Sequence, residues 1–420
     1  MSHPVQRESS RVVERCQVCD SPDLESILFL GYLPPVNTMR KLGEKPREES
    51  CYPAEMLYCP RCHLVQLGLT VDAGILFPPE YPYTSSTTSV LRENFAELYR
   101  ECISMVALGA GDLVIDIGSN DGNLLMNFKD RHRVLGVTPE EIGKIAIERG
   151  IPTLIDYFTP QVASRILTEQ GPAKVITATN VFAHMDGIHE VLDAILRLLS
   201  EDGVFISESH YLLDLVQGLQ YDTVYHEHLR YYSLHSLNYL LRMHGLEVFH
   251  VRRIPTHGGS FRAYAARQGR YGVMESVDRL LREESPVVCE TGKLRRFRDR
   301  VVVSKLELLT LLSGIRMEGK SIYGISAPSR ASTLISYTGI DDGILGCVVE
   351  VRGSHKIGKY VPGTRIPVLE ESKLFEDQPD FALLLSWHIA DELIPKLRDK
   401  GFRGRFIVPL PSPRVIGRHE

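Results

Sequence analysis

Residues 113–125 read LVIDIGSNDGNLL, and this stretch decides the fold. A short apolar run of strand type is followed by a polar turn that holds Gly118 and Gly122. The next residues have the composition of a helix start. A strand, a glycine-containing turn and a helix in this order are typical of a nucleotide-binding α/β unit.

The turn favours S-adenosylmethionine over a dinucleotide. It is not the dinucleotide G-x-G-x-x-G, because Asp116 precedes it and Gly118 and Gly122 are its only glycines. In a D-x-G-x-x-x-G turn the glycines admit the methionine part of the cofactor close to the backbone, and the acid can pair with its ammonium. The predicted cofactor-binding residues are Asp116, Gly118, Asn120, Asp121, Gly122 and Asn180.

Downstream segments extend this unit into a sheet. Strand-like runs at 133–137, 174–178 and 203–208 alternate with helical sequence, which predicts a parallel, doubly wound sheet. Thr138 stands where a ribose-binding acid is expected, with Glu140 and Glu141 just beyond, so the ribose contact is left unassigned.

The run NVFAHMD at 180–186 follows one of these strands, at the sheet edge where ligands bind in open α/β folds. His184 is therefore a candidate site residue. The alternative is a histidine that packs or caps a helix.

Composition narrows the class of protein. The chain has 420 residues, 43% hydrophobic and 24% charged, as expected for a globular protein of two or three domains. Its net charge of −5 argues against a nucleic-acid partner. No apolar run approaches the ~20 residues that span a bilayer, and the N-terminus lacks a signal-peptide core, so we expect a cytoplasmic protein without a membrane partner. The oligomeric state is left open, a monomer included.

Four of the eight cysteines form two C-x-x-C pairs, Cys16 with Cys19 and Cys59 with Cys62. Two such knuckles supply a tetrahedral thiolate site, and a small N-terminal module of roughly 70 residues commonly needs a metal to supplement its core. We therefore predict structural zinc, with reduced thiols or a redox pair as alternatives. Catalytic zinc is disfavoured because four thiolates leave no open position.

The segment 221–233 reads YDTVYHEHLRYYS and concentrates groups that move protons near neutral pH. Its density, downstream of a cofactor-type loop, predicts an acid–base site. His226, in the middle of the alternating run, is expected to face away and pack.

Five elements together resemble a known family: the two C-x-x-C pairs, DIGSNDG, NVFAH, YDTVYHEHLRYYSL and HGGSFR at 257–262. They look like the bacterial deoxysugar C-methyltransferases, which methylate C-3 of nucleotide-linked 4-keto-6-deoxyhexoses. The likeness covers nearly the whole chain. It implies a zinc-binding domain at 1–72, a Rossmann-like S-adenosylmethionine domain at 73–270, and a second Rossmann-like domain at 271–420 that holds the nucleotide sugar.

The resemblance also implies catalytic roles. Tyr225, Glu227 and His228 map onto the family's active-site tyrosine, glutamate and base, and His184 maps onto a second active-site histidine. We therefore expect His228 to remove the proton beside the ketone, Glu227 to orient it or share its proton, and Tyr225 or His184 to hydrogen-bond the enolate oxygen. An imidazole suits the base role because its ordinary pKa lies near working pH.

The C-terminal half begins with charged helical sequence at 273–312, followed by strand-like runs that begin near residues 321, 346, 381 and 405. Relatives carry an alanine-lysine-glycine turn where this chain has Ala327–Arg330, and an aspartate where it has Glu350. The predicted substrate-binding residues are Tyr81, Tyr83, Tyr225, Ser329, Arg330, Lys356, Lys359 and Tyr360.

Other functions stay open at this point. An O-methyltransferase, or a C-methyltransferase that acts on another keto acceptor, would use the same base. A zinc-ribbon RNA-binding methyltransferase and a non-catalytic nucleotide-sugar-binding protein are the alternatives from other classes.

Overall fold

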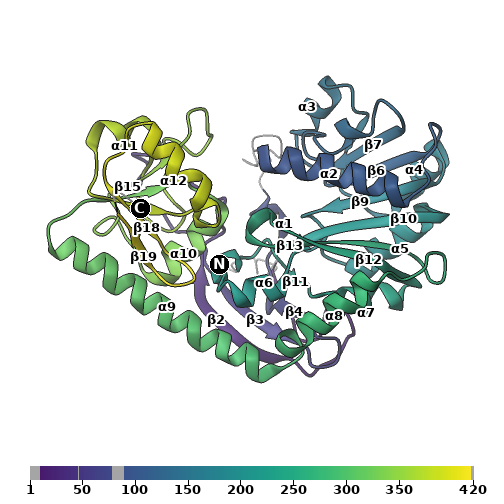
Figure 1. Ribbon diagram of the computed structural model, residues 1–420, viewed down its shortest axis with the longest axis horizontal. Coiled ribbons are helices and arrows are strands. Elements are labelled where there is room, and N and C mark those ends of the chain that lie inside the picture. The colour runs from purple at the N-terminus through teal and green to yellow at the C-terminus, as the bar shows by residue number, and fades with distance from the viewer. Residues whose placement is uncertain (1–9, 46, 78–88, 418–420) are drawn as a thin grey trace, which may run out of the picture.

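The computed structural model describes residues 10–45, 47–77 and 89–417. Two lobes stand side by side in Figure 1, the S-adenosylmethionine-type domain on the right and the C-terminal domain on the left. The N-terminal strands β2 and β3 lie low between them. A long helix, α9, runs beneath the C-terminal lobe toward the base of the other.

The N-terminal module is a small antiparallel sheet with strand order β11-β4-β3-β2, beside a separate β1–β5 pair. Its elements are β1 (Arg11–Val12), β2 (Glu25–Leu33), β3 (Tyr52–Tyr58), β4 (Val65–Leu67), β5 (Leu69–Thr70) and α1 (Ala73–Leu76). The fourth strand, β11 (Arg230–Tyr231), comes from the predicted catalytic segment and pairs with β4. The zinc module therefore shares a sheet with that segment.

The central domain is built on a seven-stranded sheet with order β12-β13-β10-β9-β6-β7-β8. Strands β8, β7, β6, β9 and β10 are parallel, and β13 and β12 close one edge antiparallel. The strand order reverses between β6 and β9, which is where such sheets bind ligands. Its elements are α2 (Ser89–Met105), β6 (Leu113–Ile117), η2 (Leu125–Asn127), β7 (Arg133–Thr138), α3 (Gly143–Glu148), β8 (Thr153–Ile155), α4 (Pro160–Gln170), β9 (Ala173–Thr179), α5 (Ile188–Leu198), β10 (Leu199–His210), α6 (Leu212–Gln217), η3 (Tyr221–Thr223), α7 (Leu234–Met243), β12 (Leu246–Ile254), η4 (Thr256–Gly258) and β13 (Ser260–Arg267).

Local sequence explains these elements. All five residues of β6 are buried, as expected for a central parallel strand covered on both faces. The helix α5 buries apolar residues at helical spacing along one stripe. Side chains cap α4 and α7 of the central domain: Thr159 accepts from Val162 N at the start of α4, and Ser233 and Ser236 form a capping box on α7.

The C-terminal lobe is a second open sheet, with order β16-β15-β14-β17-β18-β19. All neighbouring strands are parallel except β18 and β19. Its strand order reverses between β14 and β17. Its elements are β14 (Ile322–Ile325), α10 (Ser329–Thr338), β15 (Cys347–Glu350), β16 (Val368–Glu370), α11 (Ser372–Asp377), β17 (Phe381–Leu384), η5 (Trp387–Ile389), α12 (Ala390–Asp399), β18 (Arg405–Val408) and β19 (Arg414–Ile416).

The charged sequence predicted to be helical over 273–312 forms two helices, α8 (Glu275–Val288) and α9 (Thr291–Met317). Residues of these helices join a single apolar core with residues of the zinc module and both sheets. In the described part of the chain, no helix combines the length and apolar character needed to cross a membrane. The α/β architecture predicted from the sequence is confirmed, whereas the domain boundaries at 72/73 and 270/271 remain a prediction.

Candidate active site

The turn after β6 has the backbone geometry of a cofactor loop. Gly118 and Gly122 have φ of +75° and +78°, and Asn120 also lies in the left-handed region at +50°. A Cβ on Gly118 would lie 2.8 Å from a methyl carbon of Val181, so this position excludes every other residue. The loop therefore packs closely against the Val181 side chain in the segment after β9.

Two polar atoms near this loop fit a ligand. The hydroxyl of Ser119 and the side-chain carbonyl of Asn180 are buried and find no hydrogen-bond partner among the described residues. Asn180 has a positive φ of +56° at the end of β9, across the switch point from Gly118. Since buried polar groups are normally paired, these atoms suit the polar groups of S-adenosylmethionine.

Two predicted cofactor residues, and Thr138 at the expected ribose position, have contacts within the protein. Asp116 is buried and accepts from Thr177 Oγ1 at 2.6 Å, and burial raises the pKa of its carboxyl to about 7. Asp121 is held by Arg149 Nη1 at 2.9 Å. Thr138 donates to Glu140, which brings that carboxylate to the end of β7 where a ribose acid is expected. The direct cofactor contacts of Asp116 and Asp121 stay predictions.

Four histidines from different elements converge beside the cofactor loop. His184 follows β9, His210 ends β10, His228 lies in the segment before β11, and His257 lies in η4. The His228 ring is 4.8 Å from that of His184 and 4.9 Å from that of His210, between ring centroids. His210 stacks on His257 at 5.5 Å. Sequence reasoning found His184 and His228 but missed His210 and His257.

Burial keeps these imidazoles neutral. It lowers the pKa of His184 and that of His257 to about 4, and the pKa values of His210 and His228 fall well below 6.5. Charge on neighbouring histidines adds to the effect, and Arg330 lowers the pKa values of His210, His228 and His257 further. A neutral imidazole has a free lone pair, which a base requires.

The hydrogen bond of His228 fixes which nitrogen carries that lone pair. Its Nδ1 lies 2.8 Å from the carbonyl oxygen of Thr223. A carbonyl only accepts, so Nδ1 holds the proton and Nε2 is unprotonated. The ring centroids of Tyr225 and His228 are 4.1 Å apart. Burial raises the pKa of the Tyr225 phenol well above 10, so the phenol keeps its proton and remains a donor.

Glu227 lies where the zinc module, the central domain and the C-terminal lobe come together. Asn37 of the zinc module donates to its Oε1 at 2.6 Å, and Ser329 of the C-terminal lobe donates to Asn37 Oδ1 at 3.4 Å. Lys356 is close enough for Glu227 to raise its pKa, although burial, the larger effect, lowers that pKa. Asn37 was missed because its neighbours in sequence, between the two knuckles, carry no catalytic pattern.

The other predicted substrate residues differ in position. Arg330 is buried against Asp222 with Nε to Oδ2 at 2.8 Å. The backbones of Lys359 and Lys41 form an antiparallel β-bridge, and the Tyr360 amide donates to the Arg40 carbonyl at 2.8 Å. Lys359 and Tyr360 therefore lie where the zinc module docks. Tyr81 and Tyr83 fall outside the described residues. His226 points to the N-terminal sheet, with Nε2 3.2 Å from the Pro53 carbonyl, in line with the expected packing role.

The four knuckle cysteines gather in one buried cluster. The Sγ atoms of Cys16 and Cys62 are 3.4 Å apart, as are those of Cys19 and Cys59, and all four lie within 4.8 Å of one another. Zinc–sulfur bonds of about 2.3 Å in a tetrahedron require a similar spacing. The donor set therefore fits a zinc ion, and Cys51, which is exposed, is not part of it.

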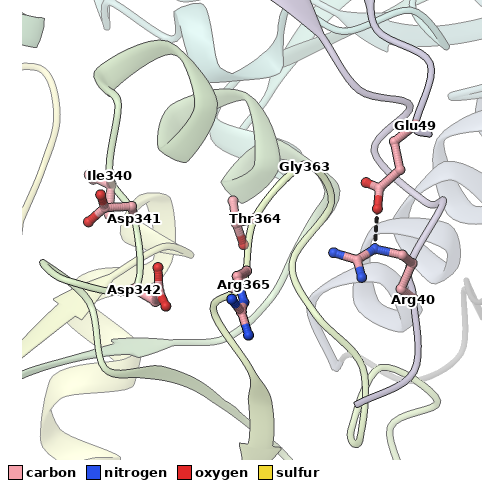
Figure 2. Close-up of a pocket in the computed structure, with 8 residues that line it drawn as sticks. All are labelled: Arg40, Glu49, Ile340, Asp341, Asp342, Gly363, Thr364 and Arg365. Carbon is pink, nitrogen blue, oxygen red and sulfur yellow. Dashed lines mark ion pairs between the residues drawn. The ribbon is translucent and has the colours of Figure 1, made fainter. Parts of the chain in front are cut away.

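Two hollows lie outside the histidine cluster. The larger, of about 380 Å³, separates the Arg40–Glu49 ion pair from acids and an arginine of the C-terminal lobe (Figure 2). The smaller, of about 10 Å³, has room for about one water and is lined by residues that include Met39, Pro328 and Lys356. Neither holds a predicted catalytic residue, and the catalytic role of the histidine cluster stays a prediction.

Comparison with known proteins gives the family. A putative zinc binding domain matches residues 16–77, a methyltransferase domain residues 91–251, and a C-methyltransferase C-terminal domain residues 255–411. C-methyltransferase NovU of Streptomyces niveus is 34% identical over 413 residues, which cover 97% of each chain. The chain belongs to this C-methyltransferase family. The predicted resemblance, the dependence on S-adenosylmethionine and the zinc-binding domain are confirmed.

Two solved structures each resemble part of the C-methyltransferase. A methyltransferase from Anabaena variabilis is 16% identical, covers 43% of this chain and 86% of its own, and has a TM-score of 0.35. Magnesium protoporphyrin IX methyltransferase of Synechocystis, solved with S-adenosylmethionine, is 11% identical, covers 42% and 79%, and has a TM-score of 0.32. We conclude nothing about this chain from likeness at this level.

Proposed function

We propose that this C-methyltransferase acts on a nucleotide-linked 4-keto-deoxysugar and forms an enolate at C-3 before methyl transfer. The observation that carries the proposal is the hydrogen bond from His228 Nδ1 to the Thr223 carbonyl at 2.8 Å. It leaves Nε2 unprotonated, in a cluster of neutral imidazoles. A carbon beside a ketone is the acid that such a base can deprotonate if donors hold the resulting oxyanion.

In this proposed reaction, four side chains of the site have distinct roles. His228 Nε2 removes the C-3 proton, and the Tyr225 hydroxyl and His184 donate to the developing enolate oxygen. Glu227 orients the sugar or shares the proton, held by Asn37. S-adenosylmethionine, when bound at the β6 loop, supplies the methyl group that the enolate carbon attacks.

The C-terminal lobe supports the choice of a nucleotide-linked substrate. Lys356 places its ammonium 2.6 Å from the carbonyl of Ala327, just after β14, and burial lowers its pKa. A diphosphate at this switch point would compensate that buried charge, and Ser329 at the start of α10 lies next to it. This cation lies near Glu227, so the sugar end of the substrate would reach the base.

The experiment is isotope exchange. Protein with S-adenosylhomocysteine is incubated in heavy water with nucleotide-linked 4-keto-6-deoxyhexoses, and deuterium at C-3 is read by proton NMR. We expect enzyme-dependent exchange, followed by a C-methyl product when S-adenosylmethionine is added. Methylation of oxygen, or the absence of both exchange and C-methyl product across the sugars, would contradict the proposal.

A further inference from the structure

Asp222 and Arg330 form a buried pair across the interface between the central domain and the C-terminal lobe. Arg330 Nε and Nη2 each lie 2.8 Å from one Asp222 oxygen, a bidentate arrangement. The indole of Trp387, in η5, donates to the same carboxylate at 2.7 Å. The side chain of Asp222 is fully buried and that of Arg330 is 7% exposed. Water therefore does not weaken the pair.

All five N–H groups of Arg330 have acceptors within the protein. Besides the two bonds to Asp222, Nη2 donates to Gln220 Oε1 at 3.3 Å. Nη1 donates to the His257 carbonyl at 3.4 Å and to His388 Nδ1 at 3.0 Å. A guanidinium has five donors and no more. Its donors are thus already used within the protein, and a substrate anion would have to displace one of these bonds.

The partners of Arg330 hold the segment that carries the base. Asp222 lies in η3, and the next residue, Thr223, provides the carbonyl that receives His228 Nδ1–H. Gln220 also donates to the Gly258 carbonyl, which ties η3 to η4. The position of the Thr223 carbonyl therefore depends on one arginine that belongs to the other lobe.

We propose that Arg330, through Asp222, is a positioning residue that holds His228 in the Nδ1–H tautomer. The proposal rests on the role of His228 proposed above. It replaces direct substrate binding as the function of Arg330. It also means that the base is set correctly only when the C-terminal lobe is docked, which links the lobe proposed to hold the nucleotide to the proton transfer.

The test compares full-length variants Arg330→Lys and Asp222→Asn with wild type. Histidines labelled with 15N report the tautomer of each ring by NMR, and loss of one signal set in His228→Gln assigns His228. We expect wild-type His228 to show the Nδ1–H tautomer and both variants to show a mixture. The turnover number should fall about tenfold to a hundredfold, while the KM for the sugar changes less than about threefold, because orientation and not binding is lost.

Arg398→Lys is the matched control. Arg398 also uses its guanidinium on carbonyls, those of Phe402, Gly404 and Gly417, but away from η3. Both variants alter an arginine of the C-terminal lobe. If the two variants change the melting temperature equally and only Arg330→Lys lowers turnover, the loss comes from an effect on the base and not from loosening of the lobe. If Arg330→Lys does not fold, Trp387→Phe removes a single bond to Asp222 and takes its place in the same measurements.

Three results would overturn the proposal. One is an unchanged His228 tautomer in Asp222→Asn and Arg330→Lys. Another is a raised KM with the turnover number kept, which would assign Arg330 to substrate binding. The third is an equal loss of turnover in Arg398→Lys. The tautomer of His228 is measured without substrate. If the proposed sugar chemistry fails, this measurement still tests the role of Arg330, so the two failures can be told apart.

Discussion

Asn37 Nδ2 lies 2.6 Å from Glu227 Oε1, although 190 positions separate the two residues. We predict that Asn37→Leu lowers turnover roughly 10- to 100-fold, since a hydrogen bond to a charged group is worth about 1.5–3 kcal/mol. Single-turnover methyl transfer measures the effect, and zinc content verifies that the module is intact. Asn37→Asp, of equal size, should be at least as poor, because it offers a second carboxylate in place of the donor. Wild-type turnover in both would remove Asn37 from the site.

His228→Asn tests the base. Its loss should lower methyl transfer by a factor on the order of 10² to 10⁴, while the Kd for S-adenosylmethionine, measured by calorimetry, stays near that of wild type. His226→Asn is the neighbouring control, because His226 faces the Pro53 carbonyl and not the cluster. Equal losses in the two variants would point to damage of the segment and not to a base.

The histidine cluster should make stability sensitive to acid. Burial lowers the pKa of His184 and that of His257 to about 4, whereas an unfolded histidine titrates near 6.5. Below pH ~6.5 the unfolded chain binds protons that the folded one does not. This contribution is therefore complete above pH ~6.5 and is lost as pH falls toward about 4.

Urea midpoints at pH 7, 6 and 5 measure this loss. In His257→Gln the difference between pH 7 and pH 5 should shrink, while in His355→Gln, which changes a histidine outside the cluster, it should remain. An equal difference in wild type and His257→Gln would show that other groups cause the acid sensitivity.

Removing one thiolate should reach beyond the zinc module. Cys59→Ser should release zinc and lower the melting temperature, because metal binding supplies folding free energy to a small module. It should also lower turnover, since β11 of the proposed catalytic segment pairs with β4 of that module. Cys51→Ser, at an exposed cysteine outside the cluster, is the control. Full zinc content in Cys59→Ser would contradict a four-cysteine site.

Arg252 in β12 and Arg262 in β13 are partners across neighbouring strands. Arg262 forms a buried ion pair and Arg252 an exposed one, so the two test how burial affects the cost of losing an ion pair. Arg262, with no exposed side-chain surface, binds Glu208 at 2.5 Å, and Arg262→Met should cost about 3–5 kcal/mol. Arg252 is 43% exposed and pairs with Glu97, so Arg252→Met should cost at most about 1 kcal/mol. Denaturant unfolding compares them, and similar costs would mean that burial does not decide the outcome.

Sequence reasoning has most to work with where the pattern is local. The glycines of the β6 loop, the knuckle spacing of the cysteines and the dense segment around His228 each carry their chemistry within a few positions. Asn37, His210 and His257 reach the site only through the fold. His210, for instance, ends a long strand whose sequence is otherwise that of a buried sheet.

Some predicted substrate residues have partners in the fold that their sequence context does not show. Arg330 was predicted to bind substrate because its charge could replace that of the lysine in the relatives' turn. Its acceptors within the protein lie in η3, η4 and η5, more than fifty positions away in sequence. Lys359 and Tyr360 looked like phosphate ligands in a glycine-rich stretch, and they lie where residues 40–42 dock. A side chain's partners across an interface cannot be read from its neighbours in sequence.

The Asp222–Arg330 pair also sets a rule for engineering. Grafting a C-terminal lobe from a relative is an obvious way to try to change which acceptor is methylated. If the incoming lobe lacks an arginine at position 330, the chimera retains Asp222 as a buried carboxylate whose counter-charge has gone, a loss that typically costs several kcal/mol. A chimera made to change the acceptor should therefore take residues 220–223 from the same relative as the lobe, so that both are exchanged as one unit.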